Sequence, residues 1–511
     1  MSKNTSENKR IAKNTVFLYI RMLFVMLVSL YTTRVVLRVL GVEDYGVYNV
    51  VCGFVSMFGL FNTCLTTGTN RFYNFALGKS DNEELRNTYK ASLLIQIVLI
   101  IAVLFLIESF GLWYLNNKLV IPESRVSAAN SIFQYSVISL VLLLLTTPYS
   151  AAVMAYEKMN FYAIVSIIDA VLKLVFVVLL QFITYDKLLF YGLLMMIISA
   201  FNFLLNFIYC RLKFKELRLS GGFDKLLFKN LFSFSTWSLI DPFTYTVKGQ
   251  GSNLVLNAFF GTIVNAAYGV ATQVSTAVDS FTNNLSIAFR PQIIKSYAAG
   301  DYTRTRKLMF AMSKINFMLH SMLVIPVLLE IKYLLSLWLG DGYPVYTPIF
   351  AQLVMIIQTF NCLHSPISTV MVATGEIKKI KIVSAIIICS VIPLSVVGFK
   401  LNLPPFSIFL ILLFLTIVNV LVSGKIMSQA FPTIAFGDYI KKIIIPCVEF
   451  IVLVTIIPMI SWLVLPESIL RVFIISLLSL ICTMVIGYYI ICDKNERELF
   501  RKILPIKKLK K

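Results

Sequence analysis

The sequence predicts an all-α, polytopic integral membrane protein with about 14 transmembrane helices. Apolar runs of about 20 residues recur along the whole 511-residue chain. Hydrophobic residues make up 58% of the sequence, and the mean hydropathy is +0.83. Lys and Arg gather in alternate connections between the runs. Because the runs are continuous and do not alternate with polar residues, they predict helices and not the strands of a barrel.

Fourteen spans of about 20 residues use roughly 280 residues, which leaves about 15 for each connection or tail. A sizeable soluble domain has no room in such a chain. The predicted spans are 14–39, 44–66, 90–115, 129–152, 161–183, 188–210, 230–256, 263–287, 309–338, 346–373, 380–399, 404–427, 442–464 and 469–492.

The basic residues predict the orientation of the chain. With the N-terminus inside, roughly 35 of the 46 Lys and Arg residues lie in cytoplasmic segments and about 8 lie outside. Both termini are therefore predicted to be cytoplasmic. The net charge of +21 is explained by basic residues that face anionic membrane lipids, with no need for a nucleic acid. The tail Lys507 to Lys511 is interpreted as an inner-leaflet anchor.

A weak internal repeat suggests two similar halves. Tyr45 to Tyr48 is matched by Tyr268 to Ala271, an offset of 223 (268 minus 45), and Ala76 to Gly78 is matched by Ala298 to Gly300, an offset of 222 (300 minus 78). We therefore predict a six-helix lobe over 1–215, a second over 216–430, and an added helix pair with a basic tail over 431–511. Parallel repeats of this kind typically handle a substrate between two lobes, with alternating access. The predicted function is transport.

Several segments resemble one known family. The segment 38–48, RVLGVEDYGVY, resembles the end of the first helix in bacterial polysaccharide flippases. Asn284 to Gln292, Leu337 to Gly340 and Ala373 to Lys378 resemble further segments of the same family. This family is the O-antigen (Wzx-type) flippase branch of the multidrug/oligosaccharidyl-lipid/polysaccharide (MOP) exporter superfamily.

The resemblance implies a multi-pass protein of the bacterial cytoplasmic membrane. It implies that the protein moves undecaprenyl-pyrophosphate-linked oligosaccharide repeat units to the outer leaflet for surface polysaccharide biosynthesis. Polysaccharide-assembly proteins are its candidate partners. A pyrophosphate and a hydrated glycan need a polar cavity with cations, because neither crosses hydrocarbon unaided.

Seven charged residues inside predicted spans are candidate site residues, since a charge near a helix centre costs about 2.5–3.5 kcal/mol unless it is paired or wet. They are Arg21, Arg34, Asp169, Lys173, Asp241, Lys248 and Asp279. Arg21, Arg34 and Lys248 are the predicted pyrophosphate-binding residues. Asp241, which shares a helix face with Lys248, is predicted to couple transport to an ion or proton.

Structural interpretations stay open for some of these residues. Arg34 and Arg38 lie near the outer end of their span, where Glu43 and Asp44 can pair with them. Asp169 and Lys173 have i,i+4 spacing, which favours a neutralising pair within one helix.

The sequence contains no motif for a metal, a cofactor or an enzyme's active site, so the protein is predicted not to be an enzyme. Three alternatives remain. A cation-coupled multidrug antiporter of the same superfamily favours carboxylates and aromatics in its cavity. A peptidoglycan-precursor flippase needs the same cations as a glycan flippase. A membrane polysaccharide polymerase or glycosyltransferase is expected to have larger outer loops.

Overall fold

The computed structural model describes residues 2–78, 82–156, 158–214, 217, 224–237, 239–340 and 342–491. Across these residues it contains helices and no strand, which confirms the predicted all-α class. The chain divides into two compact units. Unit 1 comprises Met1–Val270, Gly342–Pro344 and Ser395–Pro405, and unit 2 comprises Ala271–Asp341, Val345–Leu394 and Phe406–Lys511.

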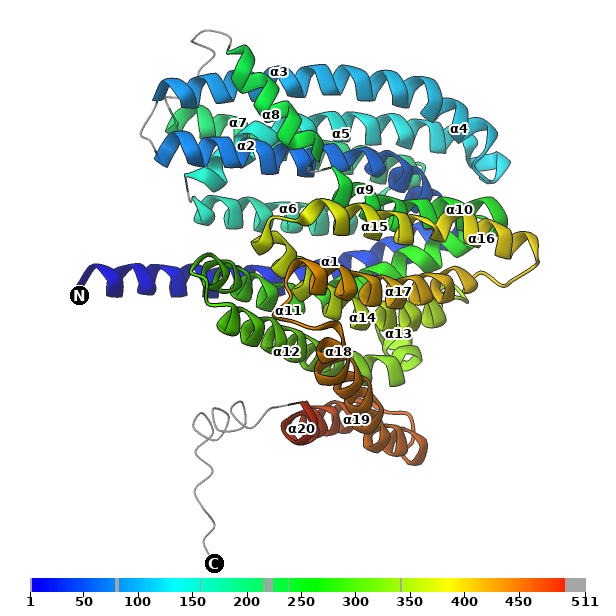
Figure 1. Cartoon of the computed structure of the whole chain (residues 1–511). Helices are drawn as coiled ribbons and strands as arrows, with labels where there is room; N and C mark the ends of the chain where they lie inside the picture. The colour runs from blue at the N-terminus through cyan, green and yellow to red at the C-terminus, as the bar shows by residue number, and fades with distance from the viewer. Residues whose placement is uncertain are drawn as a thin grey trace, which may run out of the picture. The chain divides into compact units, whose positions relative to one another are not determined.

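Unit 1 is built mainly from the first ten α-helices. Within it α2, α3, α5 and α7 lie side by side and α6 packs against α1 (Figure 1). Short 3-10 turns (η1, η3, η4) and π-helical turns (η2, η5) interrupt the longer helices. The elements are α1 Ser2–Ser56, η1 Met57–Gly59, α2 Leu60–Gly78, α3 Asn82–Leu106, η2 Ile107–Gly111, α4 Leu112–Asn117, η3 Glu123–Arg125, α5 Val126–Ala155, α6 Met159–Leu179, η4 Leu180–Phe182, α7 Lys187–Lys213, α8 Lys225–Trp237, α9 Ile240–Thr246, η5 Val247–Gly251 and α10 Ser252–Phe260.

Unit 2 contains most of the remaining helices. In it α12, α14 and α17 pack in a row, and α19 and α20 pack against each other and against α12. The boundary between the units falls within α11 and again within α16. The elements are α11 Thr262–Ala298, α12 Tyr302–Leu329, α13 Ile331–Leu339, α14 Thr347–Thr374, α15 Ile377–Cys389, α16 Val391–Lys400, α17 Ser407–Ala430, α18 Phe436–Tyr439, η6 Ile440–Ile444, α19 Ile445–Val464, α20 Ile469–Ile486 and η7 Gly487–Ile491.

Eleven helical stretches among the described residues are long and apolar enough to cross a membrane. One of them, Met22–Asn74, includes residues 22–39 of the first predicted span and all of the second. The predicted spans 230–256 and 263–287 are not among the eleven. Both are rich in Ser, Thr, Asn and Gln, and the first is divided into several short helices. The protein is thus a multi-pass membrane protein, and the number fourteen stays a prediction.

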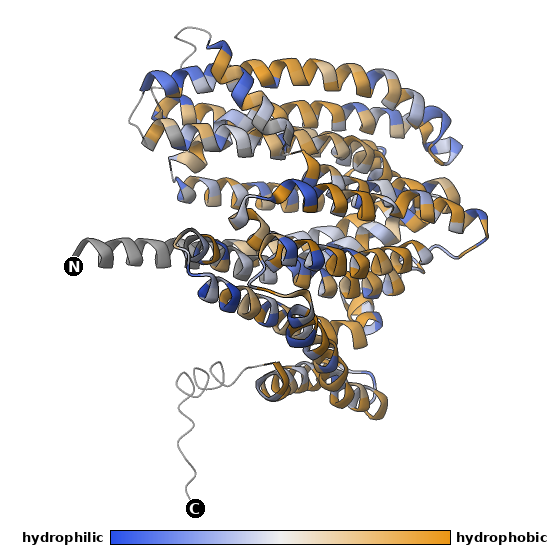
Figure 2. Ribbon diagram, in the orientation of Figure 1, coloured by the Kyte–Doolittle hydropathy of each residue, from blue (hydrophilic) through white to orange (hydrophobic). Residues whose placement is uncertain are grey.

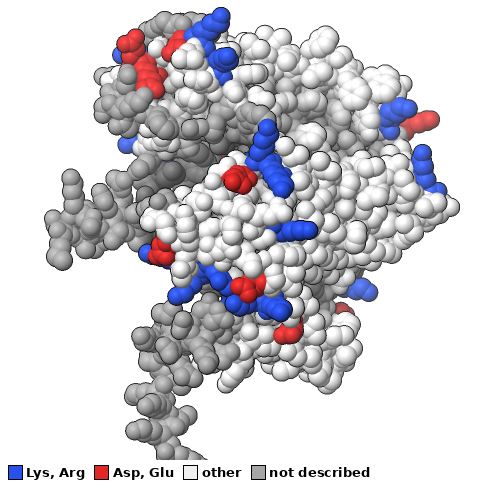
Figure 3. Space-filling model, viewed as in Figure 1, with Lys and Arg blue, Asp and Glu red and all other residues white. Residues whose placement is uncertain are grey.

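The surface matches a chain surrounded by lipid. Large apolar side chains project outward from many helices, among them Phe105 (73% exposed) and Phe182 (78% exposed). Hydrophobic residues predominate along most of the helices (Figure 2), and broad areas of the visible face carry no charged side chain (Figure 3). In water such a surface is a liability, whereas in a bilayer it is the expected one.

Each half of the sequence contains the same backbone break. Gly41 (φ 81°) interrupts α1, and Gly261 (φ 75°) separates α10 from α11. Both glycines adopt a positive φ, which side chains with a Cβ rarely tolerate. After Gly261, α11 runs for 37 residues, and after Gly41 the chain is helical over the equal stretch 42–78. The two breaks are 220 residues apart (261 minus 41), close to the offsets of the sequence repeat.

The two helices that follow these breaks approach each other closely in unit 1. A Cβ atom on Gly46 would lie 2.1 Å from the backbone oxygen of Thr262, the first residue of α11. This contact explains why glycine occupies position 46, since a backbone atom cannot rotate away as a side chain can.

We expect Gly46→Ala to lower the free energy of unfolding by about 1–3 kcal/mol, because α1 and α11 must move apart. The measurement is the temperature at which half of the purified protein is lost from the monodisperse peak in size-exclusion chromatography. Gly59→Ala is the matched control, since nothing lies within 4 Å of its added Cβ. Equal effects of the two substitutions would show that the close approach has no energetic consequence.

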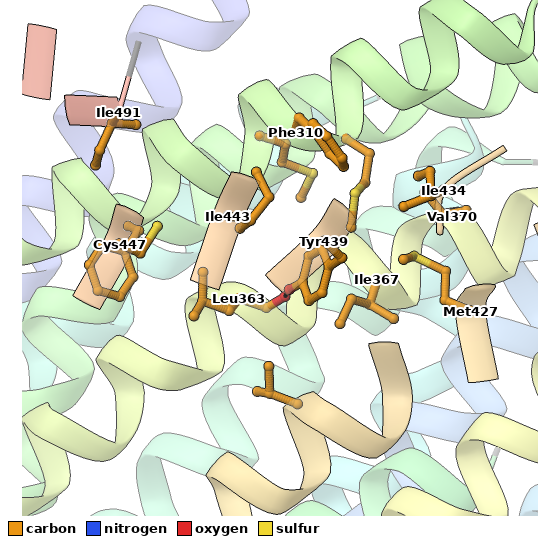
Figure 4. Packing of buried hydrophobic residues seen from close by; sticks show 14 of the residues in the cluster. Phe310, Leu363, Ile367, Val370, Met427, Ile434, Tyr439, Ile443, Cys447 and Ile491 are labelled. Atoms are coloured by element: carbon orange, nitrogen blue, oxygen red, sulfur yellow. Dashed lines mark hydrogen bonds between the residues drawn. The ribbon is translucent and has the colours of Figure 1, made fainter. Parts of the chain in front are cut away.

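The added helix pair joins unit 2 through a buried apolar cluster. Tyr439 of α18 is fully buried, and its hydroxyl donates a hydrogen bond to the backbone oxygen of Leu363 on α14 at 3.0 Å. Ile443 of η6, Cys447 of α19 and Ile367 of α14 pack in the same cluster (Figure 4). The pair formed by α19 and α20 is therefore an integral part of unit 2.

A buried ion pair also holds this pair in place. Arg471, in the first turn of α20, donates from Nε to Oε1 of Glu330 at 2.6 Å and from Nη2 to Oε2 at 2.8 Å. The Glu330 side chain is 0% exposed and that of Arg471 is 9% exposed. Arg471 also donates to the backbone oxygen of Leu465 at 3.1 Å. Glu330 links α12 to α13, so this pair joins three helices.

Candidate transport site

Unit 1 carries the residues that the sequence predicts to bind pyrophosphate, and the first group lies on α1. Arg34 and Arg38 are exposed, as is Tyr31 (51%), and the three occupy one helix face. The residues between them are buried, namely Thr32, Thr33, Val35, Val36 and Leu37. The amphipathic pattern of α1 therefore presents its cations outward from the core.

Arg21, the third predicted phosphate-binding cation, lies on α1 as well. Its side chain falls outside the described residues. Its role stays a prediction.

The second group lies where the predicted span 230–256 is interrupted. The structure divides this region into α8, α9, the π-helical turn η5 and α10. Pro242 lies in the first turn of α9, where proline costs least because the N–H it lacks has no helical partner. Two glycines, Gly249 and Gly251, lie in the wider turn of η5. The hydropathy of the sequence carries no sign of the π-helical turn, and such turns are frequent at functional sites.

Lys248 lies in η5 and is half-buried. Its ammonium lies 6.0 Å from the centroid of the Tyr245 ring, at the outer limit of a cation–π contact. Asp241 and Tyr245 are exposed one helical turn apart on α9. Asp241, Tyr245 and Lys248 thus share one face, as the sequence spacing predicted for Asp241 and Lys248. In unit 1, α1 contacts both η5 and α10. The contacts of Asn49 with Asn253 and of Gly53 with Gln250 lie after the break at Gly41, whereas Arg34 lies before it.

Buried asparagines join α1, α10 and α11 on the C-terminal side of Gly41. Asn253 Nδ2 donates to the Asn49 backbone oxygen at 3.3 Å, and Asn265 Nδ2 donates to Asn253 Oδ1 at 2.7 Å. Asn257 Nδ2 donates to Asn265 Oδ1 at 2.8 Å. Asn257 Oδ1 also accepts from the Val120 backbone N–H at 2.9 Å. The network fixes α1, α10 and α11 to one another, because an amide in hydrocarbon needs partners. Sequence reasoning missed it, although asparagines inside apolar runs were a signal.

Three of the other charged candidates, Asp169, Lys173 and Asp279, have side-chain partners. Lys173 Nζ lies 2.7 Å from Asp169 Oδ2, which confirms the predicted pair within one helix. In unit 2, Gln358 Nε2 donates to Asp279 Oδ2 at 2.6 Å and Ser275 Oγ donates to the same oxygen at 3.2 Å. These residues have structural partners, so neither pair is a further candidate for the phosphate site.

Asp44 has a partner that the sequence did not indicate. Its carboxylate lies 2.5 Å from Nη2 of Arg125, whose Nη1 lies 2.7 Å from Asp186. Asp186 also caps α7 by accepting from the Leu188 backbone N–H at 3.0 Å. Arg125 therefore connects the bend of α1 to the starts of α5 and α7. Asp44 is the residue of α1 that takes part in this connection.

Comparisons with known proteins place this architecture in a class. The family described as MatE matches residues 18–179, from α1 to the end of α6. An inward-facing multidrug resistance MATE family transporter of the MOP superfamily superposes with a TM-score of 0.67 at 13% identity, over 81% of this chain and 99% of that one. The chain therefore has a MATE-like polytopic transporter fold.

Two further proteins are similar. The lipid II flippase MurJ, in an inward closed conformation, superposes with a TM-score of 0.66 at 13% identity, over 96% of this chain and 100% of that one. The uncharacterized membrane protein EpsK of Bacillus subtilis (strain 168) is 20% identical over 329 residues, or 63% of this chain. The match spans 64% of the length of EpsK.

The structural matches differ in how much of this chain they cover. The MATE structures cover 81–82% of this chain, and the helices α1 to α17 end at residue 430 of 511. The match to the lipid II flippase covers 96% and must therefore continue into the region of α19 and α20. The added helix pair is a feature that this chain has in common with the flippase.

Proposed function

We propose that this protein is a flippase of the MOP type that moves undecaprenyl-pyrophosphate-linked oligosaccharide repeat units across the bacterial cytoplasmic membrane. The observation that carries the proposal is a set of three cations on the helices of unit 1, the exposed Arg34 and Arg38 on α1 and the half-buried Lys248 in η5. A cation on an apolar helix is costly in hydrocarbon, so these side chains fit a wet cavity with an anionic substrate.

The cations lie at two depths. Arg34 precedes Gly41 by seven residues, and Lys248 precedes Gly261 by 13. If the two glycines mark equivalent helix ends, Lys248 lies deeper by six residues, or roughly 9 Å at 1.5 Å per residue. Cations spaced in this way can receive a pyrophosphate from one another as access alternates between the two sides of the membrane. Tyr31 and Tyr245 present aromatic surfaces beside them, on which a sugar ring can stack.

The substrate is tested with purified protein in proteoliposomes that contain one candidate at a time. These are an undecaprenyl-pyrophosphate oligosaccharide, the undecaprenyl-pyrophosphate peptidoglycan precursor, and an organic cation. We expect the oligosaccharide lipid to reach the opposite leaflet faster than in protein-free vesicles. Efflux of the organic cation, with no lipid movement by folded protein, would establish the antiporter alternative, which the exposed Asp241 and Tyr245 favour.

We further propose that Asp241 couples transport to a cation, because it is an exposed carboxylate on the same face as Lys248. In Asp241→Asn, we expect the transport rate to lose its dependence on an imposed proton or sodium gradient, while slow movement down the substrate gradient remains. The rate is measured in the same vesicles with and without each gradient. A gradient dependence equal to that of the wild type would exclude this role.

A further inference from the structure

A cavity of about 500 Å³ lies in unit 2, where α14 ends, α15 begins and α17 ends. Its volume is within the range of roughly 300–1,000 Å³ that is common for small-molecule sites. The orientation predicted from the basic residues places this end of the helices at the cytoplasmic face. The lining residues are Met371, Glu376, Lys378, Lys379, Ile382, Ile426, Gln429 and Ala430.

The rim of the cavity is cationic. Lys378 and Lys379 line it against one carboxylate, Glu376, and Lys381 follows in the next turn of α15. Lys379 Nζ donates to Gln429 Oε1 at 3.0 Å, which connects the rim across α15 and α17. Because Gln429 is neutral, this bond positions the ammonium without neutralising it. The cavity therefore offers a fixed positive charge to a ligand.

The floor of the cavity is apolar and continues onto the exposed surface. Ile382, which lines the cavity, is 39% exposed, and Ile386, one turn further along α15, is 67% exposed. On α17, Leu421 is 37% exposed two turns before Gln429. The first turns of α15 are hydrophilic and the next turns hydrophobic (Figure 2). A ligand in this cavity meets charge at one end and a hydrocarbon-like surface at the other.

We propose that this cavity binds an anionic phospholipid of the inner leaflet. Lys378 and Lys379 hold the phosphate, and the acyl chains lie along Ile382 and Ile386. The arrangement fits the general rule that basic pockets between membrane helices on the cytoplasmic side bind anionic headgroups. The inference depends on the membrane orientation and not on the identity of the transported substrate. It predicts that the lipid stabilises unit 2 at the contact of α15 with α17.

The test is native mass spectrometry of the full chain, purified with phosphatidylcholine or with phosphatidylglycerol. We expect one phosphatidylglycerol molecule to remain bound more tightly than the others, and Lys378→Gln/Lys379→Gln to weaken its affinity about 10- to 30-fold. Ala430→Phe, which keeps the charge but fills the cavity, is expected to remove the same molecule.

Lys441→Gln/Lys442→Gln is the matched control, since these adjacent lysines of η6 are exposed and do not line the cavity. Equal losses in the two double variants would overturn the proposal, because general surface charge would then explain binding. Unchanged binding in Ala430→Phe would overturn it as well. Inorganic pyrophosphate is the competing probe, and if it displaces the bound lipid at equal concentration, the site belongs to a soluble phosphate and not to a phospholipid.

Discussion

Lys248→Ala is expected to reduce flipping of the pyrophosphate-linked oligosaccharide roughly 10- to 100-fold. A hydrogen bond to a charged group contributes about 1.5–3 kcal/mol, and each 1.4 kcal/mol changes an equilibrium or rate about tenfold. The effect should be large because Lys248 is half-buried in η5, where water replaces a lost cation poorly. The measurement is the initial rate of lipid movement in proteoliposomes at a fixed amount of folded protein.

Two controls separate this role from a general effect. Lys248→Arg keeps the charge and should retain much of the rate. Lys229→Ala removes an exposed lysine from α8 and should leave the rate unchanged. Wild-type flipping by Lys248→Ala, with normal yield and melting temperature, would remove Lys248 from the phosphate site and leave Arg34 as the described candidate.

Much of the fold follows from the sequence because the bilayer imposes a strict rule on it. A chain in lipid must satisfy its own backbone, so an apolar run of about 20 residues already specifies a helix. The break at Gly41 was also visible, since the segment 38–48 resembled a helix end and the structure has φ 81° there. The region 230–256 was predicted less well, because hydropathy carries no signal for a π-helical turn such as η5.

The contacts of the site were predictable only where they are local. The pair of Asp169 with Lys173 follows from i,i+4 spacing and is present at 2.7 Å. The sequence offers Asp44 as a partner for arginines on its own helix, whereas the structure pairs it with Arg125, 81 residues further along the chain. Hydropathy and spacing describe single helices, so the partner of a charge on another helix depends on packing that the sequence pattern does not encode.

Removing one partner of the buried ion pair between Glu330 and Arg471 is expected to lower the free energy of unfolding by about 3–5 kcal/mol. Arg471→Leu leaves the carboxylate of Glu330, which is 0% exposed, without its bidentate partner. Glu330→Leu leaves the guanidinium with the Leu465 backbone oxygen and with Glu467 at 3.5 Å. Both variants should therefore loosen α20 from α12 and α13.

The double variant Glu330→Leu/Arg471→Leu should be more stable than either single variant, because it removes the uncompensated charge and leaves apolar groups in a buried site. Melting temperatures of the four proteins, measured by size-exclusion chromatography after heating, complete the cycle. Lys442→Ala breaks an exposed pair with Asp438 at 3.6 Å and should change the free energy of unfolding by no more than about 1 kcal/mol. Additive losses in the double variant would contradict coupling between the two charges. Coupling would instead show that a charge pair helps to fix α20. Such a pair requires one orientation of the two side chains, whereas apolar packing does not.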